Sequence, residues 1–152
     1  MNASDYFLPQ AADETDLSPW SSILPSPVRV LRTNLFGDSF LVGAAGMVHL
    51  LDRGGCSTEC IAASEREFWQ EIEEDREGWQ LRALADECRS AGKLLADGQC
   101  YAFTTPPVLG GGYAVENVWI APWREWFSLT ADLFRQIEAV PDGAIISLKV
   151  VE

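Results

Sequence analysis

GQCYAFTTPPVLGGGYAVENVWIAP, residues 98–122, is the stretch of sequence that decides the fold of this chain. Two runs within it, 100–104 and 113–121, carry the aromatic and β-branched residues typical of half-buried strands. Between them a Pro-Pro pair removes two backbone donors, and a Gly-Gly-Gly run allows positive φ or a close approach of the backbone. The residues therefore predict two strands joined by a shaped loop. The loop by itself indicates no chemistry.

We expect the residues of this loop to matter for folding before binding. The prolines and glycines restrict the path of the crossing, and the Glu-Asn pair holds the start of the second strand. The residues given this structural role are Pro106, Pro107, Gly110, Gly111, Glu116 and Asn117.

Upstream, residues 28–62 predict an antiparallel meander. The runs VRVLRTNLF, SFLVGA and MVHLLD are separated by turns at Gly37-Asp38 and Ala45-Gly46. The segment ECIA, residues 59–62, fits a short fourth strand. One face of such a sheet can remain exposed to water.

Three stretches carry helical signals. Ser64 followed by Glu67 has the form of a capping box, which predicts a helix from about Glu65 until Gly78 interrupts it. A second helix is predicted over 79–91. The clearest amphipathic pattern runs over 123–139, where apolar residues recur at helical spacing. A turn at 141–143 and a last strand at 144–151 complete the pattern.

These elements predict an α+β fold with a mostly antiparallel sheet and helices packed on one face. Residues 1–27 hold four acids and four prolines and predict an N-terminal arm with a short helix at Ser18-Pro19. Residues 28–152 have a length that suits a single domain.

The charge balance narrows the classes of partner. Eleven Lys and Arg against 23 Asp and Glu give a formal net charge of −12, which disfavours direct nucleic-acid binding and favours basic proteins. No stretch is apolar enough to predict a membrane span, and the first residues lack the layout of a signal peptide, so we expect a cytoplasmic protein. Four cysteines predict free thiols there.

The sequence contains no strong catalytic, metal-binding or phosphate-binding motif. His49, the single histidine, lies in a strand-like run with no nucleophile marked nearby in sequence, and a hydrogen-bonded strand residue is the simpler interpretation. Cys56 and Cys60 are imperfectly spaced for half of a zinc site. The Gly-Gly-Gly run lacks the lysine of a phosphate-binding loop. We therefore predict no enzyme, no metal and no cofactor.

Several motifs carry a resemblance to a known family. These are Gly98-Gln99-Cys100-Tyr101-x-Phe103-x-x-Pro106-Pro107-x-Leu109-Gly110-Gly111-x-Tyr113-x-x-Glu116-Asn117-Val118, then Gln136-Ile137 and Pro141-Asp142-Gly143, with Asn34-Leu35-Phe36-Gly37-Asp38, Gly46 and His49-Leu50-Leu51-Asp52 upstream. Over about residues 28–151 the chain resembles the C-terminal domain of type VI secretion immunity proteins that protect against DNase toxins, related to the SUKH (Smi/Knr-type) superfamily. The resemblance implies a SUKH-like cytoplasmic domain that neutralises a co-encoded toxin by occlusion, with no catalytic residues.

A nuclease toxin needs a basic surface, which an acidic protein can meet. Residues 65–89 hold nine acids and four arginines. The candidate partner-binding residues are Glu71, Glu73, Glu74 and Asp75 as charge complement, with Trp79 and Tyr113 as anchors. A solvated helix face and core aromatics are the alternative interpretation of the same residues. Alternative functions are an interaction or scaffold module with no toxin partner and, less favoured, a small-molecule-binding domain.

Overall fold

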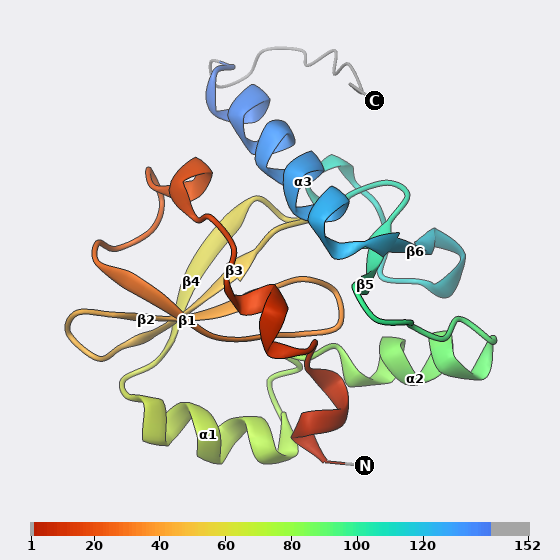
Figure 1. The fold of residues 1–152 in the computed structure, drawn as a ribbon, viewed down its shortest axis with the longest axis horizontal. Coiled ribbons are helices and arrows are strands. Elements are labelled where there is room, and N and C mark those ends of the chain that lie inside the picture. The colour runs from red at the N-terminus through yellow and green to blue at the C-terminus, as the bar shows by residue number, and fades with distance from the viewer. Residues whose placement is uncertain (1, 141–152) are drawn as a thin grey trace.

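The computed structural model describes residues 2–140 and has an α+β architecture, as predicted (Figure 1). Four strands form one antiparallel sheet, two form a second, and three α-helices pack around them. The strands are β1 (Val28–Thr33), β2 (Ser39–Gly43), β3 (Val48–Asp52), β4 (Ser57–Ala62), β5 (Gln99–Phe103) and β6 (Val118–Pro122), and the helices are α1 (Glu65–Glu74), α2 (Arg82–Ser90) and α3 (Trp123–Glu138). The predicted turn at 141–143 and strand at 144–151 lie outside the described residues.

The meander predicted over 28–62 is confirmed. Its strands lie in the order β1-β2-β3-β4, and each pairs antiparallel with the next. The segment ECIA belongs to β4, which begins earlier, at Ser57. The register places Ser39 opposite Leu51 at the open end of the β2–β3 hairpin and Val42 opposite Val48 next to its loop. The length of this loop sets the pairing register.

Both faces of this sheet are covered, which corrects the expectation of helices on one face only (Figure 1). Strand β2 carries three consecutive apolar residues, and successive side chains point to opposite faces. Phe40 and Val42 pack with Phe68 and Ile72 of α1. Leu41 points the other way, into a cluster that includes Phe134 of α3 and Trp20. The consecutive apolar residues 40–42 therefore indicate a strand that is buried on both faces.

The predicted strand pair of the 98–122 stretch is confirmed as the antiparallel hairpin β5–β6, in which Phe103 faces Val118. The second strand begins at Val118 rather than at residue 113, because Val115–Asn117 form a 3-10 turn. Helix α3 follows β6 directly and begins at Trp123, as its periodicity predicted. The backbone N–H of Tyr101 donates to the carbonyl of Leu35 at 2.8 Å, and the indole of Trp126 donates to the carbonyl of Phe36 at 3.2 Å. The loop after β1 therefore connects the two sheets.

The segment between α1 and α2 differs from the prediction. Helix α1 begins at Glu65, with the Ser64 hydroxyl accepting from the Glu67 N–H at 3.2 Å, but it ends at Glu74. Asp75 takes a left-handed conformation at φ 48°, and Leu81 does so at φ 52° just before α2 begins. Residues 75–81 are therefore a turn, and Trp79 lies in that turn rather than in the second helix.

Residues 3–20 include three short 3-10 helices: Ala3–Tyr6 lies against α1, Gln10–Asp13 against β1, and Ser18–Trp20 against α3 (Figure 1). Phe7 makes an isolated bridge to Asn34, and Trp20 stacks on Phe134 with ring centroids 4.8 Å apart. None of the helices in the described part of the chain combines the length and apolar character needed to cross a membrane.

Candidate functional site

The loop between β5 and β6 is closed by one side chain. Asn117 accepts from the N–H of Thr105 and donates to the carbonyls of Thr105 and Gly112, each at 2.9 Å. A Cβ on Gly111 would lie 1.7 Å from the Thr105 carbonyl oxygen, so only glycine fits there. Gly110 ends a short 3-10 helix at φ 93°.

The other members of the predicted structural motif lie around this closure. Pro106 is buried, and its carbonyl accepts from the N–H groups of Leu109 and Gly111. Pro107 begins the short 3-10 helix. Glu116 is exposed, within the 3-10 turn that precedes β6. The closed loop presents Val108, Leu109 and Tyr113 to solvent, with Tyr113 52% exposed.

Tyr113 also lines a concave site of about 320 Å³, which we call the acidic hollow. Four carboxylates from four parts of the chain line it. Asp38 precedes β2, Asp52 ends β3, Glu59 lies in β4, and Glu77 lies in the turn between α1 and α2. The other lining residues are Leu50, Gly78, Trp79 and Leu81.

Antiparallel pairing brings two of these carboxylates together. Because Ser39 faces Leu51, Asp38 and Asp52 are neighbours at the same end of the β2–β3 hairpin. Burial raises the pKa of Asp38 well above its usual range, and the charge of Asp52 raises it further. Burial also raises the pKa of Asp52. Each accepts one backbone N–H, from Arg53 at 3.1 Å and Gly55 at 2.9 Å respectively. The hollow therefore combines desolvation with like-charge repulsion.

The two candidate anchors meet at this hollow. Burial, then the charges of Asp52 and Asp38, raise the pKa of Tyr113 to about 12, so its hydroxyl stays protonated. The ring of Tyr113 contacts Phe103 edge to face, with centroids 5.4 Å apart. Trp79 is partly buried and stacks on Phe68 of α1 at 5.9 Å. One wall of the acidic hollow is thus the exposed side chain of Tyr113, and the other is the indole of Trp79, which packs on Phe68.

The four acids predicted to face outward from the first helix separate into two groups. Glu71, Glu73 and Glu74 lie on α1, where the last two are exposed and Glu74 pairs with Arg76 at 2.7 Å. Asp75 is buried, which corrects its outward placement. Its carboxylate accepts from the N–H groups of Trp79 at 2.8 Å and Gln80 at 2.9 Å. None of the four lines the acidic hollow.

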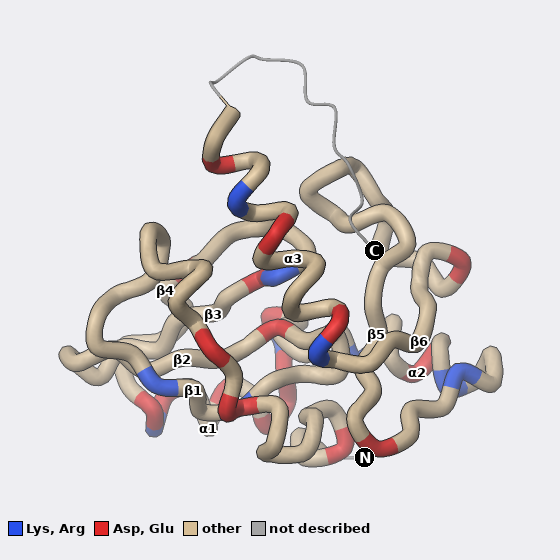
Figure 2. Tube along the Cα trace, turned by 45° about the horizontal axis from the view of Figure 1, so that its top comes forward, with Lys and Arg blue, Asp and Glu red and all other residues tan. Residues whose placement is uncertain are grey.

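Sequence reasoning did not select Asp38, Asp52, Glu59 or Glu77 as site residues. A usable signal existed, because Asp38 directly precedes one predicted meander strand and Asp52 ends the next, and antiparallel pairing brings these two positions to the same end of the β2–β3 hairpin. The convergence of Glu77 and Tyr113 on the same place depends on contacts across the fold and had no such signal. Acidic positions outnumber basic ones along the chain, while α3 carries both signs (Figure 2).

Comparison with known families gives a match over the second part of the chain. Residues 62–134 match the family described as T6SS immunity protein Tdi1, C-terminal. Over this stretch the chain is similar to a type VI secretion immunity-protein domain. A search of curated proteins found no match.

The match to the immunity-protein domain extends from the last residue of β4 into α3. It includes the β5–β6 loop, Trp79, Glu77 and Tyr113, whereas Asp38, Asp52 and Glu59 precede it. The match is shorter than the span 28–151 over which the residues resemble the family. The acidic hollow therefore lies where the matched region meets the meander.

Proposed function

We propose that this protein binds a cognate toxin and neutralises it by occlusion, that the toxin is a basic nuclease, and that the acidic hollow receives one of its cationic side chains. The observation that carries the proposal is the acidic hollow itself, lined by four carboxylates and by Trp79 and Tyr113 in a chain similar to an immunity-protein domain. A nuclease acts on DNA, so we propose that neutralisation takes place in the cytoplasm.

The electrostatics of the hollow support a cationic occupant. Burial raises the pKa values of both Asp38 and Asp52, and the negative charge of Asp52 raises the pKa of Asp38 further. A lysine or arginine side chain of the toxin would offset this repulsion and favour both ionised carboxylates. A guanidinium would also find aromatic faces at the rim, from Trp79 and Tyr113.

The surroundings of the hollow support a protein partner rather than a free ion. Val108, Leu109 and Tyr113 are all at least one-third exposed on the loop beside it. Anchors at the centre of tight protein interfaces are commonly aromatic, with polar residues around them. Among the described residues, no three His, Cys, Asp or Glu side chains are placed to hold a metal ion. We therefore propose binding and not catalysis.

The acids of α1 add a long-range contribution in this proposal. Glu71, Glu73 and Glu74 lie outside the hollow, so we assign them to attraction during encounter rather than to close contact. Asp75 is left out of the binding set, because its carboxylate is occupied by two backbone N–H groups inside the fold.

The test is binding to the toxin encoded beside this protein's gene, measured with the purified pair by surface plasmon resonance. The double variant Glu59→Gln, Glu77→Gln removes two exposed charges from the hollow. We expect its affinity to fall about tenfold or more, as for loss of charge pairs at an interface. Raised salt should slow association of the unaltered protein.

The matched control is Glu87→Gln, Glu125→Gln, which removes the same charge from exposed positions on α2 and α3. Its affinity should stay within about twofold of the unaltered protein. Equal loss in the two double variants would contradict a role for the hollow and leave only general attraction. If no complex forms at any salt concentration, the chain is an interaction module without that toxin as partner.

A further inference from the structure

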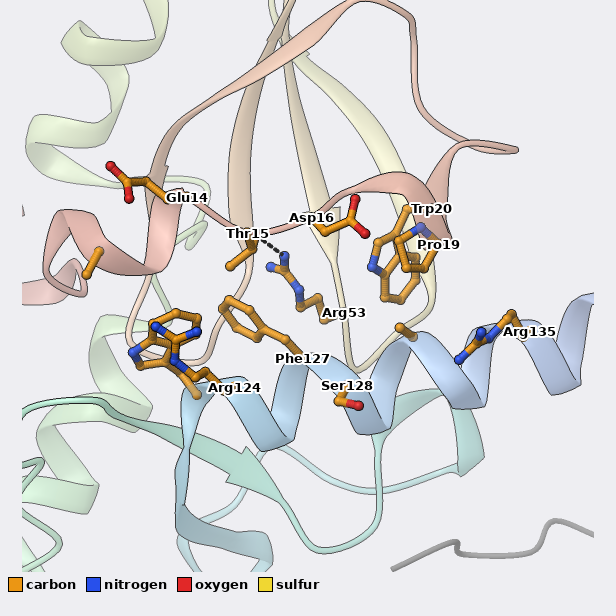
Figure 3. A pocket seen from close by; sticks show the side chains of 13 residues that line it. Glu14, Thr15, Asp16, Pro19, Trp20, Arg53, Arg124, Phe127, Ser128 and Arg135 are labelled. Carbon is orange, nitrogen blue, oxygen red and sulfur yellow. Dashed lines mark hydrogen bonds between the residues drawn. The ribbon is translucent and has the colours of Figure 1, made fainter.

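A second concave site lies on the opposite side of the sheet from α1, between α3 and residues 11–20 (Figure 3). Its volume is about 410 Å³, within the range of ligand-binding pockets. It is lined by three of the nine arginines in a chain of net charge −12. We call it the arginine pocket, for Arg53, Arg124 and Arg135.

One stripe of α3 forms a wall of the arginine pocket. Arg124, Ser128, Ala131 and Arg135 are spaced four, three and four residues apart, so they lie along the same side of the helix. Figure 3 shows the two arginines toward the two ends of the pocket, with Ser128 between them. Ser128 and Ala131 have small side chains, which leave the middle of the pocket open. The longer side chains of Arg124 and Arg135 lie on either side of this opening.

Arg53 lies deeper. Its side chain is 1% exposed and lies 3.7 Å from the centroid of the Phe127 ring. The guanidinium donates to the carbonyl of Gly37 and the hydroxyl of Ser39, both at 2.7 Å, and to Thr15 at 3.3 Å (Figure 3). Among the described residues its Nε has no hydrogen-bond partner, and no carboxylate lies within 4.0 Å of it. Burial lowers the pKa of Arg53 to about 10, and the charge of Asp38 offsets this only in part from a longer distance, so a further anion nearby would be favourable.

Neither acid that lines the pocket, Glu14 or Asp16, lies within 4.0 Å of an arginine nitrogen among the described residues. The carboxylate of Asp16 accepts from the N–H and hydroxyl of Ser18 and so holds the local turn. Glu14 is exposed on the opposite wall. Arg135 pairs with Asp132 at 2.6 Å, while Arg124 stacks over its neighbour Trp123 at 4.6 Å without an ion pair in the described part of the chain. Arg124 is therefore the cation available to a ligand.

We propose that the arginine pocket binds a small organic anion, a phosphate ester or carboxylate of about mononucleotide size, with its charged group between Arg124 and Ser128. Arginine presents planar, charge-assisted donors suited to both anions, and the Ser128 hydroxyl adds one more. Arg53 supplies a fixed positive charge beneath. The size of the pocket favours a small molecule over a protein surface.

The test is isothermal titration calorimetry with inorganic phosphate, citrate, AMP and, as the uncharged match for AMP, adenosine. We expect AMP or citrate to bind, and adenosine to bind at least about tenfold more weakly than AMP, because the charged group makes the charge-assisted contacts. Arg124→Gln should weaken anion binding about tenfold, and Ser128→Asp should weaken it further by placing a negative charge in the pocket.

Arg66→Gln is the matched control, since Arg66 is exposed on α1 and the substitution changes the net charge equally. It should change affinity less than about twofold. The proposal is overturned if none of the anions binds at millimolar concentration, or if Arg124→Gln and Ser128→Asp bind as well as Arg66→Gln. It is also overturned if these two variants lose toxin binding while no anion binds, because the pocket would then be a protein contact.

Discussion

The side-chain amide of Asn117 pairs with the backbone of Thr105 through two hydrogen bonds of 2.9 Å, one in each direction. The backbone of Asn117 adds a third link by accepting from the N–H of Thr104 at 2.8 Å. One residue therefore extends the β5–β6 ladder beyond Phe103 and Val118. The loop that carries Tyr113 to the acidic hollow depends on this closure.

Asn117→Asp should destabilise the protein. The substitution keeps the acceptor for the Thr105 N–H but replaces the two N–H donations with a carboxylate beside two carbonyl oxygens. We expect the free energy of unfolding to fall by about 2 kcal/mol at neutral pH. Urea denaturation followed by tryptophan fluorescence measures this change, and unaltered stability would show that the closure does not hold the loop.

Gly111→Ala should be more damaging than Gly112→Ala. The added Cβ at residue 111 would overlap the Thr105 carbonyl, whereas a Cβ at residue 112 meets nothing within 4 Å. We expect a loss of about 3 kcal/mol for the first, since backbone must move, and less than about 0.5 kcal/mol for the second. Thermal denaturation of the two variants side by side tests this, and similar melting temperatures would refute it.

Asp38→Asn should stabilise the protein near neutral pH. Burial and Asp52 raise the pKa of Asp38 above its ordinary value of 3.8, so the folded state favours the protonated form. The stabilising contribution of this group is complete below about pH 4 and is lost as pH rises through the raised pKa. The amide keeps an acceptor for the Arg53 N–H but carries no charge. A gain in the free energy of unfolding follows at pH 7.

The measurement is urea denaturation of both proteins from pH 4 to pH 8. The unaltered protein should lose stability relative to Asp38→Asn as pH rises, and the difference should vanish toward pH 4. A constant difference across this range would show that the carboxylate does not titrate there. Greater stability with weaker toxin binding would indicate that repulsion in the hollow serves recognition.

Arg53→Lys should destabilise the protein although the charge is kept. Lysine cannot reproduce the planar stack on Phe127 or the separate donations to Ser39 and Thr15. We expect a loss of about 2–3 kcal/mol. Arg66→Lys, at an exposed position of α1, is the control and should change the free energy of unfolding by less than about 0.5 kcal/mol. Equal effects would contradict a buried role for Arg53.

Tyr113→Ala and Trp79→Ala should separate binding from folding. Tyr113 is half exposed and contacts Phe103 only at its edge, so its removal should lower toxin affinity about tenfold with little change in melting temperature. Trp79 stacks on the core residue Phe68, so its removal should lower stability as well, by about 2 kcal/mol. Toxin affinity and melting temperature are measured for both, and unchanged affinity in Tyr113→Ala would contradict its role as an anchor.

Local patterns predicted most of the elements. The alternation and turns of 28–62 indicated the meander, Ser64 marked the start of α1, and the 3.6-residue period of 123–139 indicated α3. The end of α1 was less well predicted. Gly78 was the expected stop, but Asp75 adopts the left-handed conformation three residues earlier because its carboxylate binds the amides that follow. A side chain that competes with the helix for backbone hydrogen bonds leaves no periodic pattern in the sequence, so the end of α1 could not be predicted from periodicity.

The 98–122 stretch by itself determined a hairpin with a constrained loop, since proline and glycine restrict or release backbone angles regardless of what surrounds them. Composition likewise determined an acidic chain suited to basic partners. Only the tertiary structure decided where the charges gather. Asp38, Asp52, Glu59 and Glu77 meet Tyr113, and Arg53 lies under α3, because pairing register and packing bring distant residues together. Those contacts depend on the whole fold, and no local pattern encodes them.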